Sequence, residues 1–264
     1  MTRYYNSFSQ QIIVLKFGSS ILKSFADYRY VIDEIKRFID KKYKVIAVVS
    51  AIGNTTNNLI NEQLKYSNQK LNTNTKSYAL FLATGELQSA AYITSKLQEE
   101  GFKSDLIDNP IIAEGSYDEA NPIDIYENLF NESFNNNQVI VVPGFIASNR
   151  LNETCLLGRG GSDLTALFIA HKLKARCILL KDVDGIYEDD PKLYPKAKRL
   201  NRLTYDYAIN KVTQAVQNRA IIWAQENYLA FEIGAINSNS YTTLGALQNS
   251  FINSDNDRFF KHSA

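Results

Sequence analysis

Cysteine and histidine are scarce in this sequence, which has two of each in 264 residues. Cys155 and Cys177 have no zinc-ligand spacing, are too few for a disulfide framework, and lack a neighbour that would activate a thiol. His171 falls in a predicted helix and His262 near the end of the chain, so neither is placed as a general base. We therefore expect no metal site built from side chains.

An excess of charge of one sign is also missing, since Lys and Arg number 29 against 28 for Asp and Glu. A nearly neutral chain lacks the basic surplus that nucleic acids and anionic membranes require. No apolar run approaches the roughly 20 residues that span a bilayer, and residues 1–10 lack the apolar core of a signal peptide. We expect a cytoplasmic protein that binds neither nucleic acid nor membrane.

Hydrophobic residues, 45% of the chain, alternate between strand-like and helix-like patterns. Continuous apolar runs predict buried strands at 11–18, 44–53, 138–148, 175–185 and 228–237. Apolar residues at helical spacing predict helices within 27–43, 79–101, 156–173 and 205–227. Strands that alternate with helices predict a parallel sheet covered on both faces.

Two polar stretches, 61–77 and 126–138, predict connections, the first of them a surface segment or part of a helical lid. Residues 248–264 show no element and predict a poorly structured tail. No repeat or linker marks a boundary, so we interpret residues 1–247 as one domain of two lobes that divide near residue 150.

Three glycine-bearing loops follow predicted strands, at 18–20, 53–56 and 158–163. Ligands of parallel α/β sheets bind beyond the carboxyl ends of the strands, and the third loop opens a helix whose N-terminal N–H groups favour an anion. Arg159 in that loop is able to clamp a carboxylate or phosphate. Lys16, which ends the first strand, is costly to bury unless it meets an anion.

The motifs of two common nucleotide sites are absent, because no GxxxxGK[ST] occurs and no GxGxxG follows the first strand. The remaining pattern suits phosphoryl transfer, which needs positioned cations and N–H donors more than acids and bases. The block KDVDGIYEDDP at 181–191 has two readings. It is either an ordinary acidic turn or a nucleotide pocket, with Asp182 and Tyr187 near adenosine and Lys181 or Lys192 near phosphates.

Five blocks, taken in order, resemble aspartate kinases of the amino acid kinase family: VLKFGSS, VVSAIGNTTNNLI, LATGELQSA, GRGGSDLTA and KDVDGIYEDDP. The likeness spans roughly residues 12–245. It implies a three-layer αβα sandwich around a mainly parallel sheet, with an N-terminal substrate lobe and a C-terminal nucleotide lobe. It also implies transfer of the ATP γ-phosphate to the β-carboxylate of L-aspartate in amino-acid biosynthesis, with Mg²⁺ held mainly through the nucleotide.

The resemblance also implies roles for individual residues. Lys16 would stabilise the transferring phosphoryl group and Asp163 would orient Lys16. The phosphates would be held by Gly18, Ser19, Gly160 and Gly161. Glu86 would bind the substrate ammonium and Arg159 a substrate carboxylate. Further substrate contacts would come from Ser50, Thr56 and Ser162.

Three departures from the family pattern stand out. Ser19 replaces the second loop glycine, and Lys181-Asp182 replaces Thr-Asp. A gapless alignment puts Gln214 where the family has a nucleotide-contacting lysine, for which Lys181 or Arg219 is a possible substitute. These features look more like the kinase-like regions joined to homoserine dehydrogenase in some bacteria.

Two alternatives to an active aspartate kinase therefore stay open. One is a catalytically weak partner subunit that binds aspartate or nucleotide, with homoserine dehydrogenase as a candidate partner. The other keeps the fold and changes the acceptor, for example to another amino acid or a carbamate. The resemblance further leads us to expect a homodimer. Because 264 residues leave no room for the family's regulatory ACT domains, we expect no feedback inhibition through a domain of the chain's own.

Overall fold

The structure is a computed structural model that describes residues 11–66, 71–189, 193–194, 196–211 and 216–245. The strands are β1 (Ile12–Phe17), β2 (Lys44–Val49), β3 (Ser104–Leu106), β4 (Ile111–Gly115), β5 (Ala120–Ile125), β6 (Val139–Pro143), β7 (Ile146–Ser148), β8 (Thr154–Leu156), β9 (Arg176–Lys181), β10 (Ile186–Tyr187), β11 (Arg199–Leu200), β12 (Arg202–Leu203), β13 (Phe231–Ala235) and β14 (Thr242–Leu244). The helices are a 3₁₀ turn (Phe25–Asp27), α1 (Tyr28–Asp40), α2 (Thr55–Lys65), α3 (Lys76–Glu99), α4 (Glu127–Asn136), α5 (Gly161–Leu173), α6 (Tyr205–Lys211) and α7 (Asn218–Glu226).

The central sheet has eight strands in the order β12-β14-β13-β9-β1-β2-β6-β3. Every pair in it is parallel except β13 with β14. The five predicted strand segments all contribute to it. Four of them supply runs of buried apolar residues, whereas β13 buries Phe231 and Ile233 on either side of Glu232. The predicted mainly parallel sheet is confirmed.

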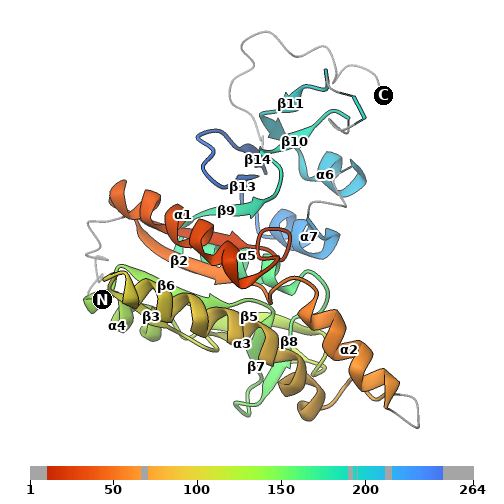
Figure 1. Ribbon diagram of the computed structural model, residues 1–264. Helices are drawn as coiled ribbons and strands as arrows, with labels where there is room; N and C mark the ends of the chain where they lie inside the picture. The colour runs from red at the N-terminus through yellow and green to blue at the C-terminus, as the bar shows by residue number, and fades with distance from the viewer. Residues whose placement is uncertain (1–10, 67–70, 190–192, 195, 212–215, 246–264) are drawn as a thin grey trace, which may run out of the picture.

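Alternate residues along the strands feed two separate cores, one on each face of the sheet. Ile13 and Leu15 pack with α1 and α3, whereas Val14 packs with α4, α5 and α7. The sheet is therefore the middle layer of three, and the predicted αβα sandwich is confirmed (Figure 1).

Two smaller sheets flank the central one. Strands β5-β4-β7-β8 form a four-stranded sheet near the lower end of the view in Figure 1, where α2 projects. The β10–β11 hairpin lies at the opposite end, beside α6. The carboxyl ends of β1, β2 and β9 lie between these two extensions.

The structure corrects three predicted elements. The single strand predicted at 138–148 is two strands, β6 in the central sheet and β7 in the four-stranded sheet. Residues 126–138 are not a polar connection, because α4 occupies most of them and buries Phe130 and Phe134, four positions apart, on one face. The single helix predicted at 205–227 is two helices, α6 and α7, and residues 212–215 between them lie outside the described part. Of the stretch 61–77, residues 61–65 are the end of α2 and 76–77 the start of α3, whereas 66 and 71–75 belong to no helix and 67–70 lie outside the described residues. The predicted tail also lies outside the described residues.

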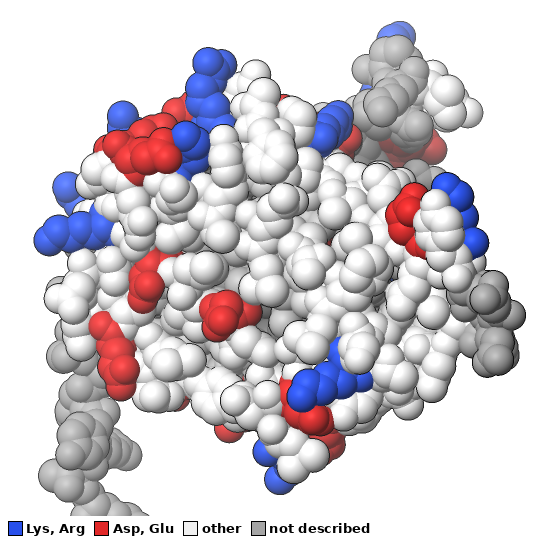
Figure 2. Space-filling view, turned by 60° about the horizontal axis from the view of Figure 1, so that its bottom comes forward, with Lys and Arg blue, Asp and Glu red and all other residues white. Residues whose placement is uncertain are grey.

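Surface charge is divided into small groups of both signs on the face drawn in Figure 2, with uncharged side chains between them. This distribution agrees with a formal net charge of +1. Among the described residues, no helix is both long and apolar enough to cross a bilayer.

A buried ion pair ties α1 to the loop that follows β13. Glu34 is fully buried and accepts two hydrogen bonds from the Arg37 guanidinium, at 2.9 and 2.5 Å. The backbone N–H of Asn237 also donates to Glu34, at 2.9 Å, and Arg37 donates to the Tyr241 hydroxyl at 2.7 Å. Both oxygens of the buried Glu34 carboxylate therefore accept hydrogen bonds.

Arg37→Met should destabilise the fold by about 3 kcal/mol, because it strands the Glu34 carboxylate without its counter-ion. Lys96→Met is the matched control, since Lys96 and Glu99 have the same i,i+3 spacing but are exposed. Urea unfolding should give a clear loss for the first variant and almost none for the second. Equal losses would contradict the assigned importance of burial.

Candidate functional site

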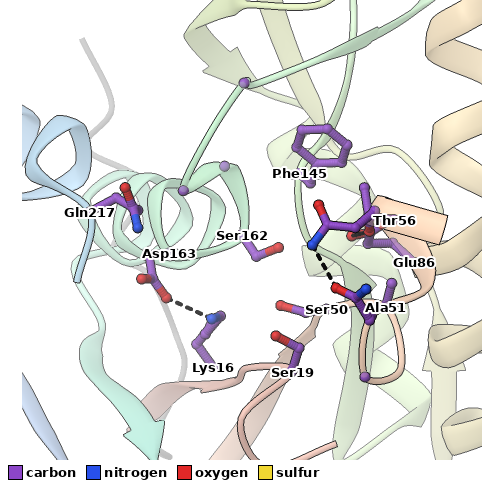
Figure 3. Close-up of a pocket in the computed structure, with 16 residues that line it drawn as sticks. Lys16, Ser19, Ser50, Ala51, Thr56, Glu86, Phe145, Ser162, Asp163 and Gln217 are labelled. Carbon is purple, nitrogen blue, oxygen red and sulfur yellow. Dashed lines mark hydrogen bonds and ion pairs between the residues drawn. The ribbon is translucent and has the colours of Figure 1, made fainter. Parts of the chain in front are cut away.

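A cavity of about 340 Å³ opens at the carboxyl ends of β1 and β2, facing the N-terminus of α5. Nine residues singled out from the sequence line it: Lys16, Ser19, Ser50, Thr56, Glu86, Gly160, Gly161, Ser162 and Asp163. They come from two strand ends, α2, α3 and the first turn of α5. Figure 3 shows Lys16 and Asp163 facing each other on one side of the cavity and Glu86 on the other.

Lys16 occupies a position where the strand pattern demands an apolar residue. It lies between Val48 of β2 and Leu179 of β9 in the ladder, and only 6% of its surface is exposed. Its ammonium meets Asp163 Oδ1 at 2.7 Å, and Asp163 is itself 5% exposed. The anion that a buried lysine requires is therefore a carboxylate from the first turn of α5.

Asp163 binds a second ammonium as well. Lys181, the last residue of β9, lies 3.2 Å from Oδ1 and 3.1 Å from Oδ2. Burial works to raise the pKa of Asp163, but Lys16 and Lys181 together outweigh it and hold that pKa at about 2. Burial lowers the pKa of Lys16 to about 8, with Asp163 opposing the shift and Lys181 adding to it. At neutral pH the three groups form a buried cluster of net charge +1.

The glycines before α5 allow its N-terminus to approach the cavity. Gly158 and Gly160 have φ of +69° and +77°, in the left-handed region that favours glycine. A Cβ on Gly160 would lie 2.5 Å from the Gln217 side chain, so the position has no room for one. First-turn N–H groups such as those of Ser162 and Asp163 have no intrahelical acceptor and are free for an anion.

Glu86 is buried in α3 with an unused hydrogen-bonding atom. Oε1 accepts a 3.5 Å contact from the Thr56 hydroxyl, whereas Oε2 has no partner among the described residues. Burial raises the pKa of Glu86 to about 7, although the amides of Ala51 and Glu86, Thr56 and Lys16 favour the ionised form. The neighbouring Gly85 lets α3 pack closely, since a Cβ there would sit 3.0 Å from that of Ala51. The arrangement lacks a cationic donor at Oε2.

Several predicted site residues are not brought to the cavity. Arg159 is exposed and does not line it, because it lies in the turn between Gly158 and Gly160. Asp182 is exposed, and the Tyr187 hydroxyl donates to Asp184 at 2.8 Å. The substrate role given to Arg159 and the nucleotide roles given to Asp182 and Tyr187 stay predictions. Lys192 and Gln214 lie outside the described residues.

Two further predicted residues have definite neighbours. Gly18 lies against Lys16, since a Cβ there would be 2.9 Å from Nζ. Arg219 donates to the carbonyl oxygens of Leu157 and Ala120 and to Asn121 Oδ1. Its guanidinium is thereby bonded around β5 and β8, and it lies next to Gly158 of the cavity lining without lining the cavity itself.

Sequence reasoning gave no site role to Asn57, Phe145 or Gln217, which line the cavity, and it singled out Asn54 only as part of the loop 53–56. Phe145 has φ of +71°, and its N–H donates to the Thr165 hydroxyl at 3.0 Å. The only sequence signal for a turn at Phe145 was the preceding glycine, Gly144. In the structure a Cβ on Gly144 would lie 2.5 Å from the Ser162 side chain. A predicted strand that runs through 138–148 gave no sign of this turn.

Comparison with known proteins places these observations in a family. A model described as the amino acid kinase family matches residues 11–227. Aspartokinase from Rickettsia bellii is 32% identical over 198 residues, which cover 74% of this chain and 49% of that protein. The chain spans about half the length of the curated relatives it matches first.

Solved structures give the same result for the fold. Aspartate kinase from Synechocystis aligns with a TM-score of 0.75 and 28% identity, over 89% of this chain and 40% of that one. Aspartokinase III from E. coli, solved with aspartate and ADP, also has a TM-score of 0.75, at 20% identity over 90% of this chain and 65% of that one.

Glu86→Gln should stabilise the ligand-free protein at pH 8 and have little effect at pH 4.5. The folded-state pKa of about 7 lies above the ordinary value of 4.5, so the contribution of Glu86 to stability is present below pH 4.5 and is lost as the pH rises through 7. The gain at pH 8 should be about 3 kcal/mol. Urea unfolding of both proteins at the two pH values measures it.

Glu34→Gln is the matched control, because Glu34 is equally buried but fully bonded to Arg37. This variant should lose stability at pH 8. A comparable loss for Glu86→Gln would mean that Glu86 already has the partners it needs.

Proposed function

We propose that this chain, which belongs to the amino acid kinase family, transfers the γ-phosphoryl group of ATP to the β-carboxylate of L-aspartate. The observation that carries the proposal is that groups of opposite charge lie on the two sides of one cavity. A buried cluster of net positive charge faces the N-terminus of α5 on one side, and a buried carboxylate without a cationic partner lies on the other.

The cationic side suits the phosphates. Lys16 and the free N–H groups at the start of α5 converge on the same part of the cavity, where an anion would be bound by charge and by hydrogen bonds together. Phosphoryl transfer depends mainly on such positioning and charge stabilisation. Asp163 holds the Lys16 ammonium in place. Because Lys181 is also bound to Asp163, the cluster keeps a net positive charge.

The Glu86 side suits the ammonium of an amino acid. An ammonium at Oε2 would supply the missing donor and would compensate a buried charge. An acceptor without a cationic group would leave Glu86 unpaired, which disfavours carbamates and simple dicarboxylates. The hydroxyls of Ser50, Thr56 and Ser162 are available for the carboxylates of the substrate.

The proposed reaction needs no general base, which agrees with the lack of a histidine among the cavity residues. The β-carboxylate is already ionised at neutral pH, so one of its oxygens attacks the γ-phosphorus directly. The bond between that phosphorus and the bridging oxygen of ADP breaks, and the products are ADP and 4-phospho-L-aspartate. Lys16 would stabilise the negative charge of the transferring group.

Magnesium fits this proposal as an ion carried by ATP. Among the described residues no three His, Cys, Asp or Glu side chains gather as a metal site. Asp163, the carboxylate nearest to the phosphate side, is engaged by two lysines. Mg²⁺ would therefore be held chiefly by phosphate oxygens, whose charge it partly neutralises.

A second candidate is a weakly catalytic partner subunit that binds aspartate or nucleotide, and Ser19 favours it. Ser19 lines the cavity where the family pattern has a glycine, and its side chain takes space beside the phosphates. Homoserine dehydrogenase is the proposed partner in that case, whereas the kinase would act as a homodimer. Binding without turnover would favour this candidate.

Purified protein given MgATP should release ADP only when L-aspartate is present, with the acyl phosphate trapped by hydroxylamine. Lys16→Met should reduce turnover by about 10²- to 10³-fold, because it removes a charge that stabilises the transition state. Lys172→Met is the control, since Lys172 pairs with Asp124 at the far end of α5. Turnover that survives Lys16→Met would point to a contaminating kinase.

Glu86→Gln should raise KM for L-aspartate by about 100-fold and leave KM for ATP almost unchanged, because only the ammonium contact weakens. Steady-state kinetics with each substrate varied measures both constants. Equal effects on the two constants would contradict the assignment of Glu86 to the amino acid.

A further inference from the structure

The charge cluster around Asp163 contains one more lysine than its own stability requires. Asp163 is already neutralised by Lys16 at 2.7 Å, yet Lys181 lies 3.1 Å from its other oxygen. All three side chains are almost dry, with 7%, 6% and 11% of the Lys16, Asp163 and Lys181 side chains exposed. Two ammonium groups therefore share one carboxylate in a poorly hydrated place.

Such a surplus is unfavourable in the empty protein. Two like charges that share a buried counter-ion repel each other, and the effect is visible on Lys16, whose pKa Lys181 helps to lower. A lysine with only a structural task would not need a buried position beside another lysine. The arrangement becomes favourable when a second anion arrives between the two ammonium groups.

Other cations in the described part of the chain do not offer this charge. Arg219 is bonded to backbone carbonyls near β5 and β8, and Arg159 is exposed. Lys181 does not itself line the cavity, but it is bound to Asp163, which does. Lys181 is the last residue of β9, the strand next to β1. It therefore lies at the carboxyl ends of the strands, where ligands of parallel α/β folds bind. It is the lysine that the fold brings to Asp163 besides Lys16.

We propose that Lys181 is a second phosphate-binding cation, whose ammonium contacts the transferring phosphoryl group together with that of Lys16 while Asp163 holds both. This inference rests on the proposed function and names a residue that acts in it. Lys181 thereby supplies the positive charge that the sequence lacks at Gln214.

The test compares the wild type with Lys181→Met and Lys181→Arg. Lys181→Met should lower kcat by about 100-fold at pH 7 with KM for L-aspartate within threefold of the wild type. Lys181→Arg should recover at least a tenth of the lost activity, because it keeps the charge. Lys172→Met, which breaks a more exposed lysine–aspartate pair at the other end of α5, should leave kcat unchanged.

The pH profile distinguishes a phosphate contact from a structural task. The groups that act on Lys16 are Asp163 of α5, Lys181 of β9 and Glu86 of α3. Without Lys181 the pKa of Lys16 rises above its value of about 8, so more of Lys16 stays protonated at pH 8 to 9. If Lys181 had only a structural role, Lys181→Met would be as active as the wild type, or more active, at pH 8 to 9. That result would overturn the proposal. A phosphate contact predicts the 100-fold loss at every pH, with the alkaline limb of kcat/KM moved upward.

A binding measurement keeps the proposal separate from the proposed reaction. The Mg²⁺ complex of β,γ-imido-ATP should bind to Lys181→Met at least tenfold more weakly than to the wild type, whereas adenosine should bind equally to both. If the wild type shows no aspartate-dependent turnover, the proposed reaction fails and this titration decides on Lys181 alone. Equal affinities for the analogue, or no binding of it to the wild type, would refute the role of Lys181.

Discussion

The ion pair between Lys16 and Asp163 is the contact around which the site is built. It joins the end of the central strand β1 to the first turn of α5, and so brings the glycine loop before α5 over the carboxyl edge of the sheet. Because both groups are buried, neither is stable there alone. Lys181 completes the cluster, and the net positive charge that results gives the cavity its preference for an anion.

Two features of the cavity cost the empty protein stability and are relieved by ligand. The Glu86 carboxylate is buried without a cationic partner, and the lysine pair is buried with one carboxylate between them. An amino acid with an ammonium group resolves the first, and a phosphate resolves the second. Glu34, equally buried but fully bonded to Arg37, shows how the same fold treats a carboxylate whose task is structural.

The layers of the fold were predictable from sequence because most of the buried parallel strands are continuous apolar runs, and β1 and β2 end just before Gly18 and Ser50. Helix α4 was missed because asparagines dominate its composition, although Phe130 and Phe134 mark a buried face. Local patterns identified Lys16 and the glycines at the start of α5, and the family resemblance identified Glu86. Neither identified the contact between Lys181 and Asp163, which depends on the neighbouring positions of β9 and β1. The exposed position of Arg159 and the turn at Phe145 depend on backbone angles that residue types do not reveal.

The most direct test of the central claim is the pKa of Lys16, measured by NMR on lysine labelled with ¹³C at Cε. The buried positive cluster predicts a pKa of about 8 in the free protein. It also predicts a rise when the Mg²⁺ complex of β,γ-imido-ATP binds, because phosphate oxygens favour the charged ammonium. An ordinary lysine pKa in the free protein, or a pKa that does not move when the nucleotide analogue binds, would contradict the account.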